Sequence, residues 1–255
     1  MKYEPGLPEP LAARLRAARR WFVLTGAGIS AESGVPTFRG AGGLWEGFRP
    51  EELASADGFR RDPARVWRWY RWRRGIVARA EPNAGHRALV SLERQVEHFS
   101  LATQNVDGLH ERAGNCNVLA LHGSIMRARC FAGCLAAAQD EEAQPVPRCI
   151  CGSPLRPDVV WFGETLPGEL LEQATVEAGH CEVCLVVGTS AFVHPAAGLP
   201  IAARLAGAIL VEVNLEETPL SPVCDAVLHG PAAIVLPDLL RCLGLLREPL
   251  PGSGV

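Results

Sequence analysis

The residues best suited to chemistry begin with a glycine-rich segment at positions 25–39, of sequence TGAGISAESGVPTFR. The spacing of Gly26, Gly28 and Ala31 fits the loose fingerprint of dinucleotide-binding loops, with alanine in the place of the third glycine. Glycine allows a tight turn and lets a ligand approach the backbone closely. The pattern predicts a nucleotide-binding loop, and a purely structural turn is the alternative because this motif alone is weak.

The second half of the segment departs from an ordinary nucleotide-binding unit, which would carry a full helix here. Pro36 stops any helix within about two turns. Ser30 or Ser33 is predicted to cap this short helix, so that its N-terminal amides face a pyrophosphate. Phe38 and Arg39 follow, and an arginine can pair with phosphate while an aromatic side chain can cover a reactive ring.

A second set of reactive residues is a group of cysteines within positions 130–151, with no histidine among them. Four thiolates without histidine are typical of a closed structural zinc site. The predicted ligands are Cys130, Cys134, Cys149 and Cys151. The pair Cys181 and Cys184 has ideal ligand spacing, but it opens a predicted buried strand, so zinc binding by this pair is the less favoured alternative.

A third pair of reactive residues lies on a helix predicted for residues 63–80. Tyr70 and Arg73 stand three positions apart, so they are neighbours on the helix surface. They share the otherwise apolar line of Val66 and Val77, which predicts that they face inward. A phenol and a guanidinium placed in this way could bind a carboxylate. The alternative is that they belong to the solvated basic face of the helix.

The elements that must position these residues are short apolar strands alternating with helices. Strands are predicted at residues 21–24, 99–102, 118–121, 181–187, 208–213 and 225–228. Helices are predicted at residues 8–19, 63–80, 84–94, 196–205 and 238–246, and residues 40–61 are expected to form a mobile cover. This alternation predicts an α/β fold with a doubly wound, Rossmann-like parallel sheet.

Polar segments directly follow five of the predicted strands. Because ligands of open α/β sheets bind beyond the carboxyl ends of the strands, these segments should converge on one crevice. They are residues 26–28, 104–107, 122–123 and 188–190, and Asn214. Their convergence is a stronger signal than any single motif.

Composition limits the remaining possibilities. The chain has 255 residues and a net charge of −3, so it can bury a full core and carries no general basic footprint for nucleic acid. No apolar run is long enough for a membrane span, and the N-terminus lacks the apolar core of a signal peptide. Nine cysteines then indicate a reducing compartment. The expectation is a cytoplasmic protein without membrane or direct nucleic-acid partners.

Several motifs occur together, and in one order, between about residues 20 and 245. They are GAGIS (26–30), PTFR (36–39), TQNVDGLH (103–110), LHG (121–123), VVWFGE (159–164), GTS (188–190) and VNLEE (213–217). In this combination they resemble the sirtuins, which are NAD-dependent protein-lysine deacylases. The resemblance implies a large Rossmann-like domain and a smaller domain made of a helical insertion and a zinc module. The implied boundaries are 1–39, 82–126 and 155–248 for the large domain, 40–81 for the helical insertion and 127–154 for the zinc module.

The resemblance also implies roles in binding NAD and in catalysis. His122 would be the general base, and Asn105 would position the ribose or a water molecule. Ile29 and Asp107 would hold the nicotinamide carboxamide, and Arg39 the phosphates. The full implied cofactor set is Gly26, Ala27, Gly28, Ile29, Phe38, Arg39, Gln104, Asn105, Asp107, Gly188, Thr189, Ser190, Asn214, Leu215, Glu216 and Ala232.

For the substrate, the resemblance implies that an acylated peptide pairs as a strand with the segment that follows residue 159. That segment is Val160, Trp161, Phe162, Gly163 and Glu164, and a plain core strand is the alternative. The spacing of Tyr70 and Arg73 matches the Tyr-x-x-Arg of the subgroup that removes succinyl and malonyl groups. Acidic acyl-lysines, together with acetyl-lysine, are therefore the expected substrates.

The implied reaction begins when the acyl oxygen attacks the sugar carbon of NAD as nicotinamide leaves. His122 then activates a ribose hydroxyl, and the products are free lysine, nicotinamide and O-acyl-ADP-ribose. ADP-ribosyl transfer to protein is the main alternative because it shares the cleavage step. A nicotinamide dehydrogenase is disfavoured, because no acidic residue closes a second strand about 20 residues on. A zinc-ribbon adaptor for nucleic acid is disfavoured by the net charge.

Overall fold

A six-stranded parallel sheet forms the centre of the computed structural model, which describes residues 6–38, 43–47, 49–134 and 144–246. Its strands are β1 (Arg20–Thr25), β2 (His98–Thr103), β3 (Val118–Ala120), β6 (Val183–Val187), β7 (Ile209–Asn214) and β8 (Ala226–His229). They lie in the order β3-β2-β1-β6-β7-β8, and every pair is parallel. The chain winds outward on both sides of β1, as in doubly wound nucleotide-binding sheets. The predicted fold class is confirmed.

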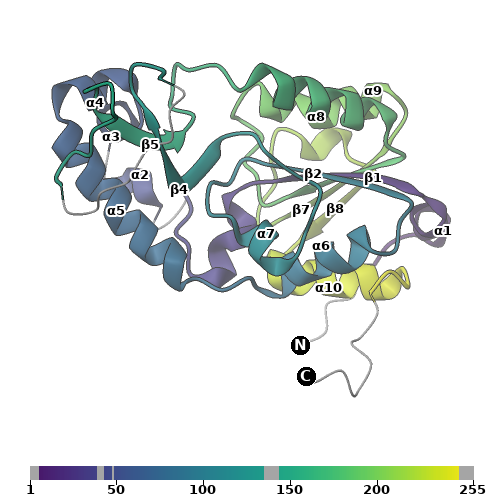
Figure 1. Cartoon of the computed structure of the whole chain (residues 1–255). Coiled ribbons are helices and arrows are strands. Elements are labelled where there is room, and N and C mark those ends of the chain that lie inside the picture. The colour runs from purple at the N-terminus through teal and green to yellow at the C-terminus, as the bar shows by residue number, and fades with distance from the viewer. Residues whose placement is uncertain (1–5, 39–42, 48, 135–143, 247–255) are drawn as a thin grey trace.

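Helices cover both faces of this sheet (Figure 1). One layer contains α1 (Glu9–Ala17), α6 (Ala84–Glu93) and α10 (Ala232–Cys242), and the other contains α8 (Gly168–His180) and α9 (Leu199–Leu205). Alternate residues of β1 serve the two layers: Trp21 and Val23 join the first core cluster, and Phe22 and Leu24 join the other. Burial on both faces explains why this strand is a continuous apolar run. None of the helices in the described ranges is long and apolar enough to cross a membrane.

A smaller lobe lies beside the carboxyl end of the sheet (Figure 1). It contains α2 (Leu44–Gly47), α3 (Pro50–Leu53), α4 (Ala56–Arg61) and α5 (Pro63–Arg79), together with the antiparallel pair β4 (Gly123–Cys130) and β5 (Leu155–Val159). The lobe has its own apolar cluster, in which Phe59, Trp67 and Trp161 are fully buried. The domain boundaries given above stay a prediction.

Side-chain caps fix the starts of the two helices that matter most for the site. The Asp62 carboxylate accepts a hydrogen bond from the Arg65 amide at 2.9 Å, and Pro63 occupies the first turn of α5. The Asn83 side chain accepts from the Gly85 amide at 2.9 Å and begins α6. Both helix starts agree with the sequence-based prediction.

The closing helix differs from its prediction over residues 238–246. It begins at Ala232 and contains Pro237, which the sequence pattern had placed before the helix. A proline inside a helix removes one backbone hydrogen bond. Here Val235 and Leu239 are buried against the core, and their burial outweighs that loss.

Other elements were also missed by sequence reasoning. Residues 40–61, expected to form a mobile cover, contain three short helices within their described part, and the mobility of this segment stays a prediction. These helices, α7 (Leu109–Ala113), α8, β4 and β5 were not predicted. The short elements among them and the antiparallel pair depend on contacts with distant segments, which a periodic pattern in the sequence does not show.

Candidate active site

Two glycine segments meet at the carboxyl end of the sheet. The Gly28 amide donates to the Gly188 carbonyl at 2.8 Å, and the Gly26 amide donates to the Val187 carbonyl at 3.0 Å. A Cβ atom on Gly28 would lie 2.7 Å from the Gly188 Cα, which is closer than any real contact. The glycines are therefore required because the loops after β1 and β6 pack backbone against backbone.

The prediction that Ser30 or Ser33 caps a short helix is wrong. Residues 27–33 form a short 3-10 helix, η1 (Ala27–Ser33), so Ser30 and Ser33 lie inside it and cap nothing. Ser30 instead donates its hydroxyl hydrogen to Asp107 Oδ2 at 2.8 Å. Ser33 Oγ accepts from the Asn83 side chain at 3.0 Å. The serines join η1 to distant segments, and a propensity argument confined to local sequence does not reveal such bonds.

The predicted convergence of the strand ends is confirmed. Gln104 Nε2 donates to Thr189 Oγ1 at 2.8 Å, which joins the ends of β2 and β6. Asn214 Nδ2 donates to the Thr189 carbonyl at 2.8 Å, which adds the end of β7. Asn105 Nδ2 donates to the Gly26 carbonyl at 3.0 Å, which adds the loop after β1.

His122 lies at the same edge, directly after β3. Its Nδ1 is 2.9 Å from the Gln104 carbonyl oxygen. A carbonyl can only accept, so Nδ1 carries the proton and Nε2 presents its lone pair. Burial lowers the pKa of His122 below its ordinary value, and the bond to Gln104 opposes this only in part. The side chain is thus a neutral base whose Nε2 receives no hydrogen bond from the described residues.

Other members of the implied cofactor set lie around this edge in different ways. Ile29 has a fully buried side chain, its amide donates to Gly26 and its carbonyl accepts from Asn83. Leu215 and Glu216 are exposed beyond β7, and Ser190 is half-buried. Ala232 begins α10 beside η1, where the neighbouring Ala233 amide donates to Glu32. Arg39 lies outside the described residues.

The comparisons with known proteins agree with this geometry. The sequence profile of the Sir2 family matches residues 26–195, which is about two thirds of the chain. The chain belongs to the Sir2 family. It is 51% identical over 233 residues to the NAD-dependent protein deacylase 2 of Pyrobaculum aerophilum, covering 91% of this chain and 94% of that protein. It is 48% identical to the NAD-dependent protein deacylase 1 of Archaeoglobus fulgidus, covering 92% and 97%.

Solved structures also resemble this Sir2 chain. A Sir2 homologue in complex with NAD superimposes with a TM-score of 0.87 at 46% identity, covering 96% of this chain and 98% of that chain. A Sir2–p53 peptide–NAD complex superimposes with a TM-score of 0.80 at 30% identity, covering 93% and 99%.

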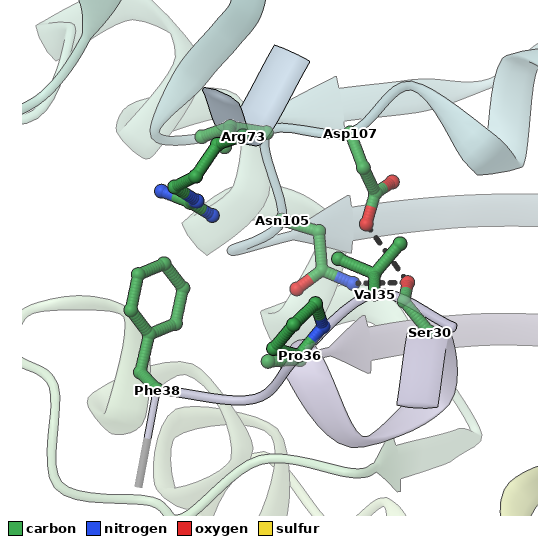
Figure 2. Close-up of a pocket in the computed structure, with 9 residues that line it drawn as sticks. Ser30, Val35, Pro36, Phe38, Arg73, Asn105 and Asp107 are labelled. Atoms are coloured by element: carbon green, nitrogen blue, oxygen red, sulfur yellow. Dashed lines mark hydrogen bonds between the residues drawn. The ribbon is translucent and has the colours of Figure 1, made fainter. Parts of the chain in front are cut away.

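The Sir2 chain has a pocket where η1 and its following segment approach α5 (Figure 2). Ser30, Asn105 and Asp107 lie on one side and are linked by hydrogen bonds, while Phe38 and Arg73 lie on the other. Asn105 uses its amide nitrogen in these bonds, and its oxygen is turned toward the pocket. Burial raises the pKa of the Asp107 carboxyl, although Leu109 and Ser30 donate hydrogen bonds to it.

Arg73 is a basic residue of this pocket, and Asp107 is an acidic one. Arg73 is only 6% exposed, and its guanidinium carbon lies 4.7 Å from the ring centre of Phe38 and 4.9 Å from that of Trp69. Within the described ranges Arg73 forms no hydrogen bond and no ion pair. Trp69, four residues before Arg73 on α5, was not predicted, although the i, i+4 spacing of a helix could have revealed it. Arg73 is thus a nearly buried residue whose N–H donors meet no acceptor in the part of the chain that the structure describes.

Tyr70 lies in the same buried region. Its hydroxyl oxygen accepts a hydrogen bond from Trp161 Nε1 at 2.9 Å. Burial raises the pKa of Tyr70, and the nearby charge of Arg73 opposes this shift. The predicted inward orientation of both residues is confirmed, because Tyr70 is 2% exposed.

The implied peptide segment, residues 160–164, follows the end of β5 as a turn rather than a strand. The amides of Val160 and Phe162 donate to the carbonyls of His122 and Ala54, both at 2.9 Å. Trp161 is a core residue, as the core-strand alternative required, whereas Phe162 is 49% exposed. The sequence alone could not show which of these two aromatic side chains is buried, because that depends on how the turn packs against the smaller lobe.

Glu164 ends this segment in an ion-pair cluster. Its carboxylate pairs with both terminal nitrogens of the nearly buried Arg156, accepts from the Trp161 amide at 2.9 Å and lies 3.3 Å from Arg129. The hydrogen bonds and charge of Arg156 outweigh the effect of burial, so the pKa of Glu164 is lowered. Arg156 was not predicted, since no spacing pattern links it to residue 164.

The cysteine cluster fits a structural zinc ion. The sulfur atoms of Cys130, Cys149 and Cys151 all lie within 4.8 Å of one another, with Cys130 and Cys151 3.5 Å apart. Cys134, the fourth predicted ligand, is a partly buried free cysteine outside this group of three, so its part in a four-thiolate set stays a prediction. Cys184 is fully buried in β6, in agreement with the prediction that it serves the core.

Proposed function

We propose that this chain is an NAD-dependent protein-lysine deacylase that prefers acidic acyl groups such as succinyl and malonyl. Membership of the Sir2 family and two relatives near 50% identity, both named NAD-dependent protein deacylase, support the reaction. The observation that carries the acyl preference is Arg73, a buried guanidinium without an ion-pair partner among the described residues.

Bound NAD would supply the sugar carbon that takes up the acyl oxygen, with nicotinamide as the leaving group. The glycine loops around Gly28 and Gly188 would let the dinucleotide approach their backbone closely. Asn214 and Ser190 would face its adenosine half. His122 would withdraw a proton from a ribose hydroxyl through Nε2, because the bond to Gln104 keeps that nitrogen unprotonated. The roles of these residues rest on their position at the sheet edge.

The case for an acidic acyl group rests on the unused donors of Arg73. A buried charge is costly unless it is paired, and stacking on Phe38 and Trp69 compensates only part of that cost. A carboxylate that entered the pocket would pair with the guanidinium, in the bidentate geometry that arginine favours. Tyr70 could add a hydroxyl donor beside it.

The protein substrate would reach this site along residues 160–164. Four amides of that segment already donate within the chain, at Val160, Trp161, Phe162 and Glu164. A bound peptide would therefore pair with carbonyl groups of the segment and with Gly163, which is exposed. Main-chain pairing of this kind gives affinity with little dependence on peptide sequence.

We also place the protein in the cytoplasm. All nine cysteines are free, and the four predicted zinc ligands would need reduced thiols to bind the ion.

The test compares succinyl-, acetyl- and unmodified lysine peptides, with nicotinamide release as the readout. We expect Arg73→Met to lower kcat/KM for the succinyl peptide by about 10- to 100-fold, the equivalent of one hydrogen-bonded charge pair of about 1.5–3 kcal/mol. Acetyl turnover should change only a few fold. Arg68→Met is the matched control, because Arg68 is an exposed arginine of the same helix.

An equal loss for both peptides in Arg73→Met would exclude the carboxylate-binding role. Nicotinamide release that is indifferent to the acyl group, or label from NAD left on the protein, would exclude deacylation itself. His122→Tyr should abolish turnover of every acyl peptide.

A further inference from the structure

We propose that Trp161 is a positioning residue for acyl selectivity, because its indole N–H fixes the hydroxyl of Tyr70 and directs the hydroxyl hydrogen toward the acyl carboxylate. The inference rests on the proposed preference for acidic acyl groups. It assigns to Trp161 a role through its buried side chain that is separate from peptide pairing by the backbone of residues 160–164.

The donor and acceptor count at Tyr70 carries the argument. An indole N–H can only donate, so the 2.9 Å bond from Trp161 Nε1 uses a lone pair of the Tyr70 oxygen. The hydroxyl hydrogen is left over, and it is donated to no group in the described part of the chain. Burial raises the pKa of Tyr70, so the hydroxyl keeps this hydrogen at any working pH. Tyr70 is thus a donor whose rotation is restricted by Trp161.

Tyr70 lies on the same helix as the proposed carboxylate partner. Tyr70 and Arg73 are three residues apart on α5, which makes them neighbours on one helix face, and both are buried. A carboxylate held by Arg73 has more lone pairs than the guanidinium uses. A hydroxyl already turned away from Trp161 can donate to one of them without losing another bond.

The indole itself is held rigidly from its own segment. The guanidinium carbon of Arg156 lies 3.3 Å from the Trp161 ring centre, and the Phe59 ring lies 5.4 Å away. Arg156 is in turn fixed by Glu164 and by the Val159 carbonyl at 2.8 Å. The segment that would receive the peptide therefore also sets the orientation of the acyl-binding hydroxyl on α5.

The test uses four variants in the full-length zinc-loaded protein: Trp161→Phe, Tyr70→Phe, the double variant of these two, and Trp67→Phe. Trp67 is the matched control, because it is a buried tryptophan of the same cluster whose Nε1 donates to the Leu155 carbonyl at 2.8 Å. The quantity compared is the ratio of kcat/KM for succinyl and acetyl peptides.

We expect Trp161→Phe to lower this ratio about fivefold to tenfold, as for the loss of one hydrogen bond. Tyr70→Phe should lower the ratio at least as much, and the double variant should be no worse than Tyr70→Phe, because both changes remove the same interaction. Trp67→Phe should leave the ratio unchanged. Benzothienylalanine at position 161 keeps the ring shape without the N–H, so it should repeat the loss even if phenylalanine at this position disturbs folding.

An unchanged ratio in Trp161→Phe and in the benzothienylalanine protein would overturn the inference, as would an equal fall in Trp67→Phe. These results differ from failure of the proposed function. If Arg73→Met lowers the ratio and the changes at position 161 do not, only the positioning role is wrong. If Arg73→Met leaves the ratio unchanged, the acidic acyl preference itself is wrong.

Discussion

Mild acid should destabilise this protein through two buried histidines. His86 at the start of α6 and His110 in α7 have ring centres 4.9 Å apart and are 0% and 1% exposed. His86 Nδ1 accepts from the Asn83 amide, and His110 Nε2 is 2.9 Å from Thr25 Oγ1. Burial, with a smaller effect of Arg87, lowers the pKa of His86 to about 4, and burial with the neighbouring His86 lowers that of His110 to about 3.

The sign and size follow from proton linkage. The ordinary histidine pKa of 6.5 applies to the unfolded chain, so below that pH the unfolded state binds protons that the folded state does not. The free energy of unfolding therefore keeps its full value above pH 6.5. It falls as the pH drops toward the folded-state pKa of each histidine, about 4 for His86 and about 3 for His110. At about pH 5 each histidine costs about 2 kcal/mol, and the pair about 4 kcal/mol, at 1.36 kcal/mol per pH unit. That is a large share of a typical stability of about 5–15 kcal/mol.

The assay is urea denaturation of the wild type and of His86→Asn and His110→Gln at several values between about pH 7.5 and 5. Asn can replace the Nδ1 contact of His86, and Gln can replace the Nε2 contact of His110. Each variant should show a pH slope smaller by about 1.4 kcal/mol per pH unit below 6, whatever its absolute stability. Acid loss of zinc affects all three proteins alike and cancels in the difference. A variant whose slope equals that of the wild type would refute the buried neutral state of that histidine.

Two further outcomes are expected. Gly188→Ala should raise KM for NAD at least tenfold, because Gly188 has a φ of +60° and a new Cβ would lie 2.5 Å from the Ile29 amide nitrogen. The control is Gly207→Ala, where φ is +97° but a Cβ would meet open space, so only the stability of the protein should fall. Cys149→Ser should lower bound zinc, measured by metal analysis, and make the smaller lobe sensitive to protease; full metal content in the variant would exclude Cys149 as a ligand.

Sequence reasoning was most successful where the signal is local or repeated. The starts of α5 and α6 were predicted from Asp62, Pro63 and Asn83, because a cap needs only the residues of one turn. The doubly wound sheet was predicted from apolar runs that alternate with helices. The meeting of five polar strand ends followed from the parallel sheet, since its strands end at one edge.

It failed where a distant segment supplies the partner. Ser30 was expected to cap a helix, but Asp107, far along the chain, offers its carboxylate instead. The closing helix was predicted to begin at residue 238, but it begins at Ala232, because the buried Val235 and Leu239 hold it despite Pro237. The pairing of residues 160–164 with a peptide stays a prediction; the segment itself forms a turn, in which the Phe162 amide donates to the Ala54 carbonyl of the smaller lobe.

The sequence by itself thus determined the fold class, the convergence of the strand ends, the presence of a cysteine cluster that fits zinc and the inward line of Tyr70 and Arg73. These depend on periodicity, spacing and turn chemistry, which act over a few residues. Only the tertiary structure decided that Arg73 lies against the rings of Phe38 and Trp69 with no ion pair to any described residue, and that Trp161 turns its indole N–H onto Tyr70. Those relations join α5 to segments remote in sequence, and they exist only once the smaller lobe has folded against the sheet.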